Sequence, residues 1–379
     1  MASPLRIGLS TTLLHDPALR DVPDGIGVYT RALGERLAAR PDAIVIPAVA
    51  RASAARAASP QAFRFPGHRH AMSAWSLATG LPFAGSSALA QQIDVFFATD
   101  YRVPRLRGVP VCATVFDAIP LSHPEWANPR LRSIKNMVLR RTVRWADRVI
   151  AISHAMVPEL VEHYRIAGDR ISVTPLGVDD YWFGREPQAG IAALRERLAL
   201  RERYLLFVGT LQPRKNVARI LAAYERLPPA LRSEVQLVIA GRAGWQTSEL
   251  VAALQRAGAA GGVRWLDYVP HADLRALYQG AAAFVFPSLY EGFGLPVLEA
   301  FASGIPVVCS NVTSLPEVAG DAALQVDPND VDALAAAMQS LIVDDVLAAE
   351  LCRRGLARAR EFTWDRCADA TFGVLRSMA

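Results

Sequence analysis

The sequence predicts an α/β protein built from two doubly wound domains, each with a parallel sheet covered by helices. Short apolar runs alternate with longer segments of helical period along most of the chain, which is the pattern of βαβ units. The chain has 379 residues, which is long for one hydrophobic core and fits two domains. About half of the residues (52%) are apolar, which is enough for two packed cores.

The first half of the chain is expected to hold six strands, several helices and one irregular segment. Its strands are expected at 6–10, 43–48, 95–98, 111–115, 148–152 and 171–173, and its helices at 27–39, 129–146 and 155–164. Residues 49–90 are rich in Ala, Ser, Arg and His and show no regular period. We therefore expect them to form a variable insertion over the edge of the first sheet.

The second half repeats the alternation with clearer periods. Its strands are expected at 204–208, 236–240, 263–266, 283–286, 307–309 and 323–326, and its helices at 216–226, 247–257, 271–280, 296–303 and 331–341. Residues 179–188 (DDYWFGREPQ) break the pattern with glycine, proline and aromatic residues, which is typical of a linker.

These patterns predict an N-terminal domain over 1–183 and a C-terminal domain over 184–362. The last helix, at about 363–379, is expected to pack back on the first domain. Two facing doubly wound domains would leave a deep interdomain cleft at the carboxyl ends of both sheets. Ligands of such folds usually bind there.

Charge and cysteine usage narrow the function classes. The net charge is +5, but residues 1–180 carry 21 basic and 15 acidic side chains, so the excess lies in the first half and favours an anionic partner. The four cysteines form no CxxC or Cys/His cluster, so neither a zinc site nor a disulfide framework is indicated. The N-terminus is interpreted as a strand, not a signal peptide, and no run of 18 apolar residues exists. We expect a cytoplasmic protein.

The most specific motif spans residues 287–306 (PSLYEGFGLPVLEAFASGIP), after an expected strand and into a helix. Glu291 lies in the loop and Glu299 on the helix, eight positions apart. Gly292 and Gly294 allow backbone amides to approach a ligand closely. The following helix N-terminus favours an anion, so the motif could hold a sugar hydroxyl, a diphosphate and a ribose in sequence. The alternative is a glycine-rich turn with two solvated carboxylates.

A second motif spans residues 207–216 (FVGTLQPRKN), where a strand ends in a glycine-containing turn. Arg214 and Lys215 stand just before the next helix. Two cations at the end of a parallel strand suit a diphosphate, because arginine binds it bidentately and lysine acts as a point charge. An isolated Arg-Lys pair is more often a solvated turn. Both motifs fall at the same sheet edge, which favours the binding interpretation.

The second half closely resembles the family 4 retaining glycosyltransferases, which have the GT-B fold of two facing Rossmann-like domains. The resemblance rests on GTLQPRKN, YEGFGLPVLEAFASGIPVVCSN, SLPEVAGDAALQVDP, DYVPHADLRALYQGAAAFVFPS and FTWDRCADAT, and covers nearly all of residues 200–370. The first half resembles the family more thinly, in DGIGVYTRAL, TVFDAIPLSHPEW, AISHAM and TPLGVD.

The resemblance implies roles for the motif residues of the second half. Arg214 and Lys215 would clamp the donor diphosphate and stabilise the departing nucleotide. Glu291 would bind hydroxyls of the donor sugar, Glu299 would accept from the ribose hydroxyls, and the loop at Tyr268 and Val269 would lie by the base. The backbone amides that would meet the sugar and phosphate belong to Phe293, Gly294 and Leu295.

In the first half the resemblance implies fewer roles. Gly25 and Gly27 look like the family's glycine-rich loop, which approaches the phosphate and sugar. Many relatives carry a histidine immediately before the aspartate that matches Asp117, whereas this chain has Phe116 there. Asp117 is the candidate for orienting the acceptor or a sugar hydroxyl, and joins Arg214, Lys215 and Glu291 in the predicted catalytic set. His123, nearby, is either part of this site or a solvated loop histidine.

The family resemblance also implies the mechanism and the substrates. It implies retention of configuration without a cofactor or bound metal, with front-face attack and no covalent nucleophile. The motif variants look most like members that build bacterial O-antigen or exopolysaccharide chains, so GDP-mannose is the first choice of donor. A UDP-, dTDP- or GDP-deoxy sugar such as rhamnose remains open.

The acceptor is expected to be a saccharide or a lipid-linked saccharide. Residues 129–145 (PRLRSIKNMVLRRTVRW) form a basic, partly apolar helix that could rest on anionic lipid at the inner face of the cytoplasmic membrane. The alternative is an ordinary surface helix with its apolar side in the core.

Three other functions would each require a different feature of the sequence. A dinucleotide-dependent dehydrogenase would need G-x-G-x-x-G after the first strand, where the chain reads TTLLHDPALRD. A non-enzymatic two-domain sugar-binding protein would bind free sugar and ignore nucleotide. A nucleic-acid binder is indicated only by the basic first half, and no recognised module is present, so nucleic acid is not expected as a partner.

Overall fold

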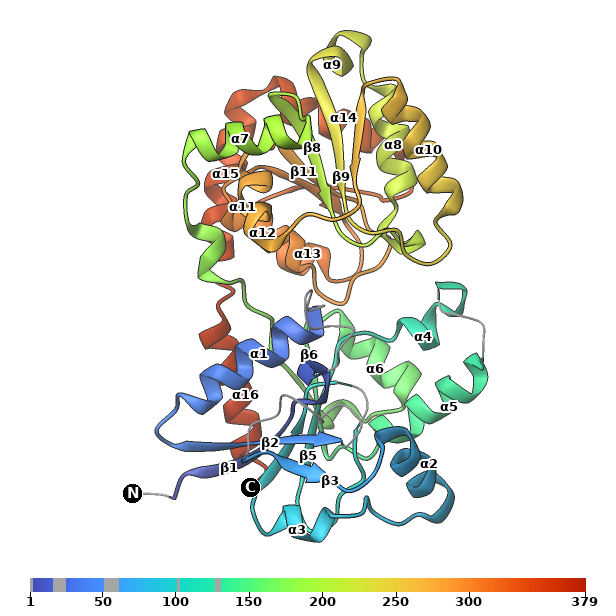
Figure 1. The fold of residues 1–379 in the computed structure, drawn as a ribbon, viewed down its shortest axis with the longest axis vertical. Coiled ribbons are helices and arrows are strands. Elements are labelled where there is room, and N and C mark those ends of the chain that lie inside the picture. The colour runs from blue at the N-terminus through green and yellow to red at the C-terminus, as the bar shows by residue number, and fades with distance from the viewer. Residues whose placement is uncertain (1–2, 16–24, 51–60, 101–102, 127–130) are drawn as a thin grey trace. The chain divides into compact units, whose positions relative to one another are not determined.

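The computed structural model describes residues 3–15, 25–50, 61–100, 103–126 and 131–379. The chain divides into two compact units (Figure 1). The first contains Met1–Gly177 together with Trp364–Ala379, and the second contains Val178–Thr363. Each unit is an α/β layer structure around its own parallel sheet, as the alternation of apolar runs predicted.

The first unit holds a seven-stranded sheet in the order β3-β2-β1-β4-β5-β6-β7, with parallel pairing throughout. Its strands are β1 (Leu5–Ser10), β2 (Ala43–Ala50), β3 (Phe63–Phe65), β4 (Val95–Ala98), β5 (Val111–Val115), β6 (Arg148–Ala151) and β7 (Ile171–Val173). Its helices are α1 (Gly25–Ala38), α2 (Arg69–Thr79), α3 (Ser86–Ala90), α4 (Ile119–Ser122), α5 (Arg132–Val143), α6 (Met156–Tyr164) and α16 (Trp364–Arg376).

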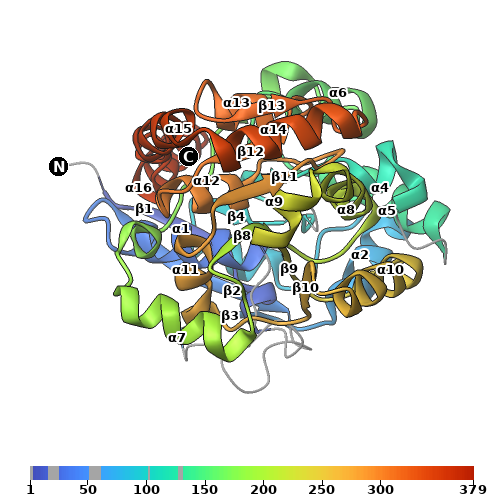
Figure 2. The same cartoon turned by 90° about the horizontal axis from the view of Figure 1, so that it is seen from above.

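The second unit holds a six-stranded parallel sheet in the order β10-β9-β8-β11-β12-β13. Its strands are β8 (Arg203–Val208), β9 (Val235–Ala240), β10 (Val263–Leu266), β11 (Ala283–Phe286), β12 (Val307–Ser310) and β13 (Leu324–Val326). Its helices are α7 (Gln188–Leu198), α8 (Val217–Arg226), α9 (Pro229–Glu234), α10 (Ser248–Ala259), α11 (His271–Gln279), α12 (Leu295–Ala302), α13 (Leu315–Ala319), α14 (Val331–Val343) and α15 (Asp345–Ala359). Helix α14 packs on α8, and α12 packs on α15 (Figure 2).

The second sheet is buried on both faces, which explains its nearly continuous apolar strands. All residues of β9, β11 and β12 are buried. The strand order reverses direction between β8 and β11, because the chain winds first toward β10 and then toward β13. Such a switch point leaves a crevice at the carboxyl ends of the two central strands.

The segment 49–90 is more regular than its composition predicts. Residues 51–60 lie outside the described residues, but Phe63–Phe65 form an edge strand whose register pairs Ala48 with Phe63. The Phe65 ring packs edge-on against Phe83 with centroids 6.0 Å apart. A three-residue strand is too short to show a period, so only its aromatic residues could have indicated it.

The first compact unit ends at Gly177, whereas the sequence placed the boundary at residue 183. Tyr181 donates a hydrogen bond from its hydroxyl to the His271 carbonyl (3.1 Å), and Arg275 donates to the Tyr181 carbonyl (2.8 Å). Trp182 packs against Tyr278 with centroids 5.3 Å apart. The aromatic residues that break the periodic pattern therefore anchor this segment to α11 in the second unit.

Helix α16 returns to the first unit and lies beside α1 (Figure 1). Trp364 packs near Tyr29 with ring centroids 6.2 Å apart, and Arg36 forms an ion pair with Asp365 at 2.7 Å. Within the described residues, no helix is both long and apolar enough to cross a membrane.

Candidate functional site

The two sequence motifs of the second unit meet at the switch point of its sheet. Residues 209–216 follow β8, and residues 287–294 follow the neighbouring strand β11. The Leu289 amide donates to the Arg214 carbonyl at 2.7 Å, which joins the two loops directly. Asn216 donates from its side-chain amide to the carbonyls of Pro287 (2.9 Å) and Pro328 (2.7 Å). These bonds hold both loops in fixed positions at the carboxyl edge of the sheet.

A cluster of three charged side chains lies where these loops meet. Arg214 Nη1 is 2.9 Å from Glu291 Oε2, and Lys215 Nζ is 2.6 Å from Glu291 Oε1. The Lys215 ammonium also lies over the Phe286 ring, 4.8 Å from its centroid. Lys215 and Glu291 each expose only 8% of their surface. The sequence motifs correctly predicted that these residues lie at one sheet edge. They assigned the cations to the diphosphate and the carboxylate to the sugar, and did not predict the ion pairs between them.

The local backbone explains how the two cations are presented. Pro213–Lys215 form a single 3-10 turn that ends at Asn216, whose φ of +62° is left-handed. Asparagine tolerates this conformation better than most residues with a side chain. The turn directs Lys215 into the interior and leaves Arg214 partly accessible, with 19% of its side chain exposed.

Burial and charge act in opposite directions on this cluster. Burial alone would raise the pKa of Glu291, but Lys215 and Arg214 outweigh it, so the pKa of this carboxyl lies below its ordinary value. Burial and the neighbouring Arg214 lower the pKa of Lys215 to about 8, although Glu291 opposes the shift. The charge of Lys215 therefore depends on the carboxylate beside it.

The N-terminus of α12 completes this part of the site. The amides of Phe293, Gly294 and Leu295 have no acceptor within the described part of the chain. Gly294 has a φ of +125°, and a Cβ there would lie 2.6 Å from Leu315, so only glycine fits. Ser314 donates its hydroxyl to the carbonyls of Glu291 (2.8 Å) and Phe293 (2.6 Å), which orients the loop. Unpartnered amides at a helix N-terminus form an anion-binding arrangement.

Glu299 lies on α12, four residues after its first residue, Leu295. Its surroundings are more apolar than those of Glu291. The Tyr278 hydroxyl donates to Glu299 Oε2 at 3.0 Å. Burial raises the pKa of Glu299 to about 7, although the Tyr278 hydrogen bond and the charge of Lys215 oppose the shift. An acid that is hard to ionise in the folded state lowers stability, and such residues are often retained for binding or catalysis.

We expect Glu299→Gln to stabilise the protein at about pH 8 and to leave it unchanged near pH 4.5. Between its ordinary pKa of 4.5 and about 7, the folded protein keeps a proton that the unfolded chain has lost, so stability falls as pH rises through this window. The full penalty is roughly 3 kcal/mol, and glutamine avoids it while still accepting from Tyr278. Thermal unfolding of both proteins across this pH range measures the difference. Equal or lower stability of the variant at pH 8 would show that Glu299 has a structural role.

The predicted base loop contains one exposed and one buried side chain. Tyr268 is 46% exposed, whereas Val269 is buried. The guanidinium of Arg242 lies over the Tyr268 ring, 4.7 Å from its centroid. Arg242 follows β9 and Tyr268 follows β10, so both residues lie at the same sheet edge as the charged cluster. Arg242 was not predicted, because nothing in the sequence marks a single arginine after an apolar strand.

In the first unit, Gly25 and Gly27 both lie in the first turn of α1, which begins two residues earlier than the predicted start of this helix at residue 27. The preceding residues 16–24 lie outside the described residues. Gly25 is exposed, with open space around the position of a Cβ, whereas Gly27 is buried. Local packing therefore does not require a glycine at position 25, and the role of Gly25 in ligand contact stays a prediction.

Asp117 lies directly after β5, at the carboxyl edge of the first sheet. Its Oδ1 accepts from the amide of Ile119, the first residue of the short helix α4, at 3.1 Å. Phe116, which replaces the family histidine, is buried edge-on against Tyr29 at 5.1 Å. His123 stacks on Trp126 with centroids 4.1 Å apart and contacts Glu125. The acceptor role of Asp117 stays a prediction.

Tyr278, Asn216 and Ser314 were missed as positioning residues. Asn216 follows the Arg-Lys pair directly and carried a usable signal, since a left-handed asparagine often ends a tight turn. Tyr278 and Ser314 lie 21 or 23 residues from the groups they contact, and the sequence around them carried no such signal. Among the described residues there is no group of three or more His, Cys, Asp or Glu side chains that could hold a metal ion.

Two family descriptions match the two halves of the chain. "Glycosyl transferases group 1" matches residues 192–361, and "Glycosyltransferase Family 4" matches residues 23–181. The chain belongs to glycosyltransferase family 4. The first match contains the charged cluster and α12, and the second contains Asp117.

Two curated relatives of this family member come from Escherichia coli. O-antigen chain mannosyltransferase B of Escherichia coli is 38% identical over 257 residues, which cover 68% of this chain and 66% of the relative. Serotype-specific mannosyltransferase WbdA of Escherichia coli is 33% identical over 255 residues, covering 65% of this chain and 31% of the relative. The chain thus spans just under two thirds of the first relative's length and under a third of the second's.

A solved structure establishes the fold. Sucrose-phosphate synthase from Thermosynechococcus elongatus superposes with a TM-score of 0.75 over 98% of both chains, at 23% sequence identity. The family member therefore has the GT-B fold, as the sequence predicted.

Proposed function

We propose that the protein transfers mannose from GDP-mannose to a saccharide acceptor in the synthesis of a bacterial surface polysaccharide. The buried cluster of two cations and one carboxylate beside the N-terminus of α12 carries the transferase proposal. The choice of mannose is supported by the names of the two Escherichia coli relatives. The alternative donors are a UDP-, dTDP- or GDP-deoxy sugar on the same site.

The site offers distinct positions to the parts of a nucleotide sugar. Arg214, Lys215 and the α12 amides supply positive charge and donors for the diphosphate. Glu299 supplies an acceptor for the ribose hydroxyls, and Glu291 supplies one for the sugar. Tyr268 offers an exposed ring face by which the base can lie. These assignments use groups at one edge of one sheet.

In the proposed reaction, the acceptor oxygen forms a bond to the anomeric carbon while the bond from that carbon to the donor phosphate breaks. The electron pair of the broken bond stays on the nucleoside diphosphate, and the acceptor proton passes to an oxygen of that leaving phosphate. Attack from the face that the phosphate leaves retains the configuration. Lys215 and Arg214 stabilise the charge that grows on the diphosphate. Glu291, held by both cations, positions the sugar and forms no bond to it.

We expect a chelator to leave transfer unchanged, because the Arg214 and Lys215 cations and the helix N-terminus take the electrostatic role of a metal ion in this proposal. The measurement is the initial rate of sugar transfer with excess EDTA and after dialysis. Activity that disappeared on chelation and returned with manganese would contradict this mechanism.

Guanosine diphosphate is expected to raise the melting temperature more than uridine or thymidine diphosphate at equal concentration. A ligand at a hundredfold excess over its Kd adds about 2.7 kcal/mol of stability, so the ranking is measurable by thermal shift. A larger shift with uridine or thymidine diphosphate would move the donor assignment to that base and leave the family unchanged. A shift with free sugar and none with any nucleotide would favour a non-enzymatic sugar-binding protein.

We further propose a lipid-linked acceptor and a peripheral contact with anionic membrane through α5. This helix begins at Arg132, and residues 127–130 before it lie outside the described residues. Ile134 and Met137 are 54% and 44% exposed, next to the exposed Lys135, so the apolar side of the helix is not wholly in the core. Apolar and basic side chains exposed together favour the interface of a bilayer.

A further inference from the structure

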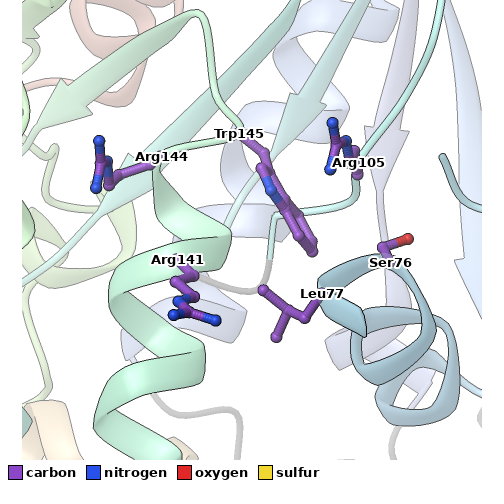
Figure 3. Close-up of a pocket in the computed structure, with 6 residues that line it drawn as sticks. All are labelled: Ser76, Leu77, Arg105, Arg141, Arg144 and Trp145. Atoms are coloured by element: carbon purple, nitrogen blue, oxygen red, sulfur yellow. The ribbon is translucent and has the colours of Figure 1, made fainter. Parts of the chain in front are cut away.

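A pocket of about 300 Å³ lies in the first unit, between helices α2 and α5. Its lining residues are Ser76, Leu77, Arg105, Arg141, Arg144 and Trp145. Figure 3 shows the Trp145 indole at its centre, with Leu77 facing it from α2. Arg105 and Arg144 lie on either side of the indole, and Arg141 lies below it on α5. Three segments therefore line the pocket, and two of them contribute its three arginines.

Arg105, Arg141 and Arg144 have no carboxylate partner among the residues that the structure describes. No carboxylate lines the pocket, and no ion pair or side-chain hydrogen bond within the described part of the chain uses their guanidinium groups. Other arginines of the same unit are paired, such as Arg6 with Asp94 (2.5 Å) and Arg69 with Asp100 (3.2 Å). Gathering three like charges is unfavourable unless an anion joins them.

The lining also defines the shape of the missing anion. Guanidinium groups bind phosphate through paired N–H donors, and three of them can surround its oxygens from several directions. Trp145 is fixed by its edge-on contact with Phe83, with centroids 6.3 Å apart, and provides an apolar wall together with Leu77. A phosphate group carried on an organic body fits this combination better than an inorganic ion.

The pocket is separate from the edge of the first sheet that carries Asp117. Arg144 and Trp145 lie in the short connection between α5 and β6, so they lie by the amino ends of the parallel strands. Asp117 follows β5, at the opposite edge. A ligand in the pocket therefore does not take the place predicted for the acceptor beside Asp117.

We propose that this pocket is a second anion site, which binds the phosphate of an anionic phospholipid headgroup. The same face of α5 supports the lipid source, because Ile134, Met137 and Arg141 are spaced by one helical turn and all three are exposed. Apolar side chains beside a phosphate pocket suit a headgroup whose acyl chains continue into a bilayer. The pocket would thus give α5 a headgroup preference in addition to charge attraction.

The test compares two double variants of equal charge by calorimetric titration. Arg105→Gln/Arg141→Gln alters the pocket, and Arg107→Gln/Arg140→Gln alters exposed neighbours outside it. The probes are dihexanoyl phosphatidylglycerol below its micelle concentration and inorganic phosphate. We expect the pocket double to bind the lipid probe at least about tenfold more weakly than wild type, since it loses two charge-assisted contacts. The outer double should change the affinity by less than about threefold.

Three further comparisons decide the interpretation. Lys215→Ala should keep the pocket-dependent binding, because its phosphate position lies in the other unit. Vesicles of phosphatidylglycerol should lose more binding with the pocket double than with the outer double. Equal losses with both doubles, or no binding of either probe, would overturn the proposal. Pocket-dependent binding of inorganic phosphate as tight as that of the lipid would keep the anion site and overturn the lipid source.

Discussion

Lys215→Ala is expected to lower the turnover of sugar transfer by about 10²–10³-fold, the scale of losing one preorganised electrostatic contact. In the proposed site, the Lys215 ammonium stabilises the donor diphosphate, whose charge grows as the sugar leaves. The loss should therefore fall mainly on kcat, which reports interactions that strengthen during reaction. Glu291 keeps its 2.9 Å ion pair with Arg214 in this variant, so the fold should persist.

The matched control for this variant is Arg226→Ala. Arg226 lies at the end of α8, and its exposed side chain pairs with Asp332 at 2.7 Å, so the substitution removes one positive charge of the same unit. It should leave transfer within about twofold of wild type, because exposed ion pairs contribute little. Comparable losses in both variants would mean that overall charge, not the position of Lys215, supports the reaction.

Glu291→Gln is expected to lower transfer by about 10²-fold and to weaken nucleoside diphosphate binding in a pH-dependent way. The Glu291 carboxylate supports the charge of Lys215, whose pKa is already lowered to about 8. Without that support the pKa of Lys215 falls further, so the lysine is largely neutral at about pH 8. Affinity should drop about tenfold there for each unit of further shift, and recover as the pH falls toward 6 and Lys215 regains its proton.

Calorimetric titration of guanosine diphosphate across this pH range measures the effect. Lys215→Ala is the control, because it keeps the titration of the nucleotide phosphate and lacks that of the lysine. Glu291→Gln will also lose stability, because removing one partner of a buried ion pair typically costs about 3–5 kcal/mol. Binding must therefore be measured well below the melting temperature of this variant. Affinity that matched wild type at every pH would show that Glu291 acts on the sugar alone.

The sequence alone does not predict that Glu291→Gln weakens nucleoside diphosphate binding. Sequence motifs and family resemblance assigned Glu291 to the sugar and Lys215 to the diphosphate, as independent groups. The structure places their charged atoms 2.6 Å apart, across 76 residues of chain. Strand order and the carboxyl-edge rule predict that the two loops meet, but only side-chain positions show that one residue sets the charge of the other.

The fold was predictable where long apolar periods recur. Strands β8 to β13 and helices α8, α10, α11, α12 and α14 match the predicted elements, and α12 begins one residue before the expected Pro296. Helices α9, α13 and α15 were not predicted. Short elements and their packing were not predictable in the same way. The edge strand Phe63–Phe65 has too few residues for a period, and Tyr181 and Trp182 look like a linker until their partners on α11 are known.

We propose that the site at the switch point of the second sheet transfers a hexose from a guanosine diphosphate sugar. The most direct test is mass spectrometry of short mannoside and lipid-linked saccharide acceptors after incubation with GDP-mannose and the purified protein. We expect a product heavier by one hexose, formed with GDP-mannose by the wild type and nearly absent with Lys215→Ala. Product formed equally by both proteins, or formed only from a uridine or thymidine diphosphate sugar, would contradict it.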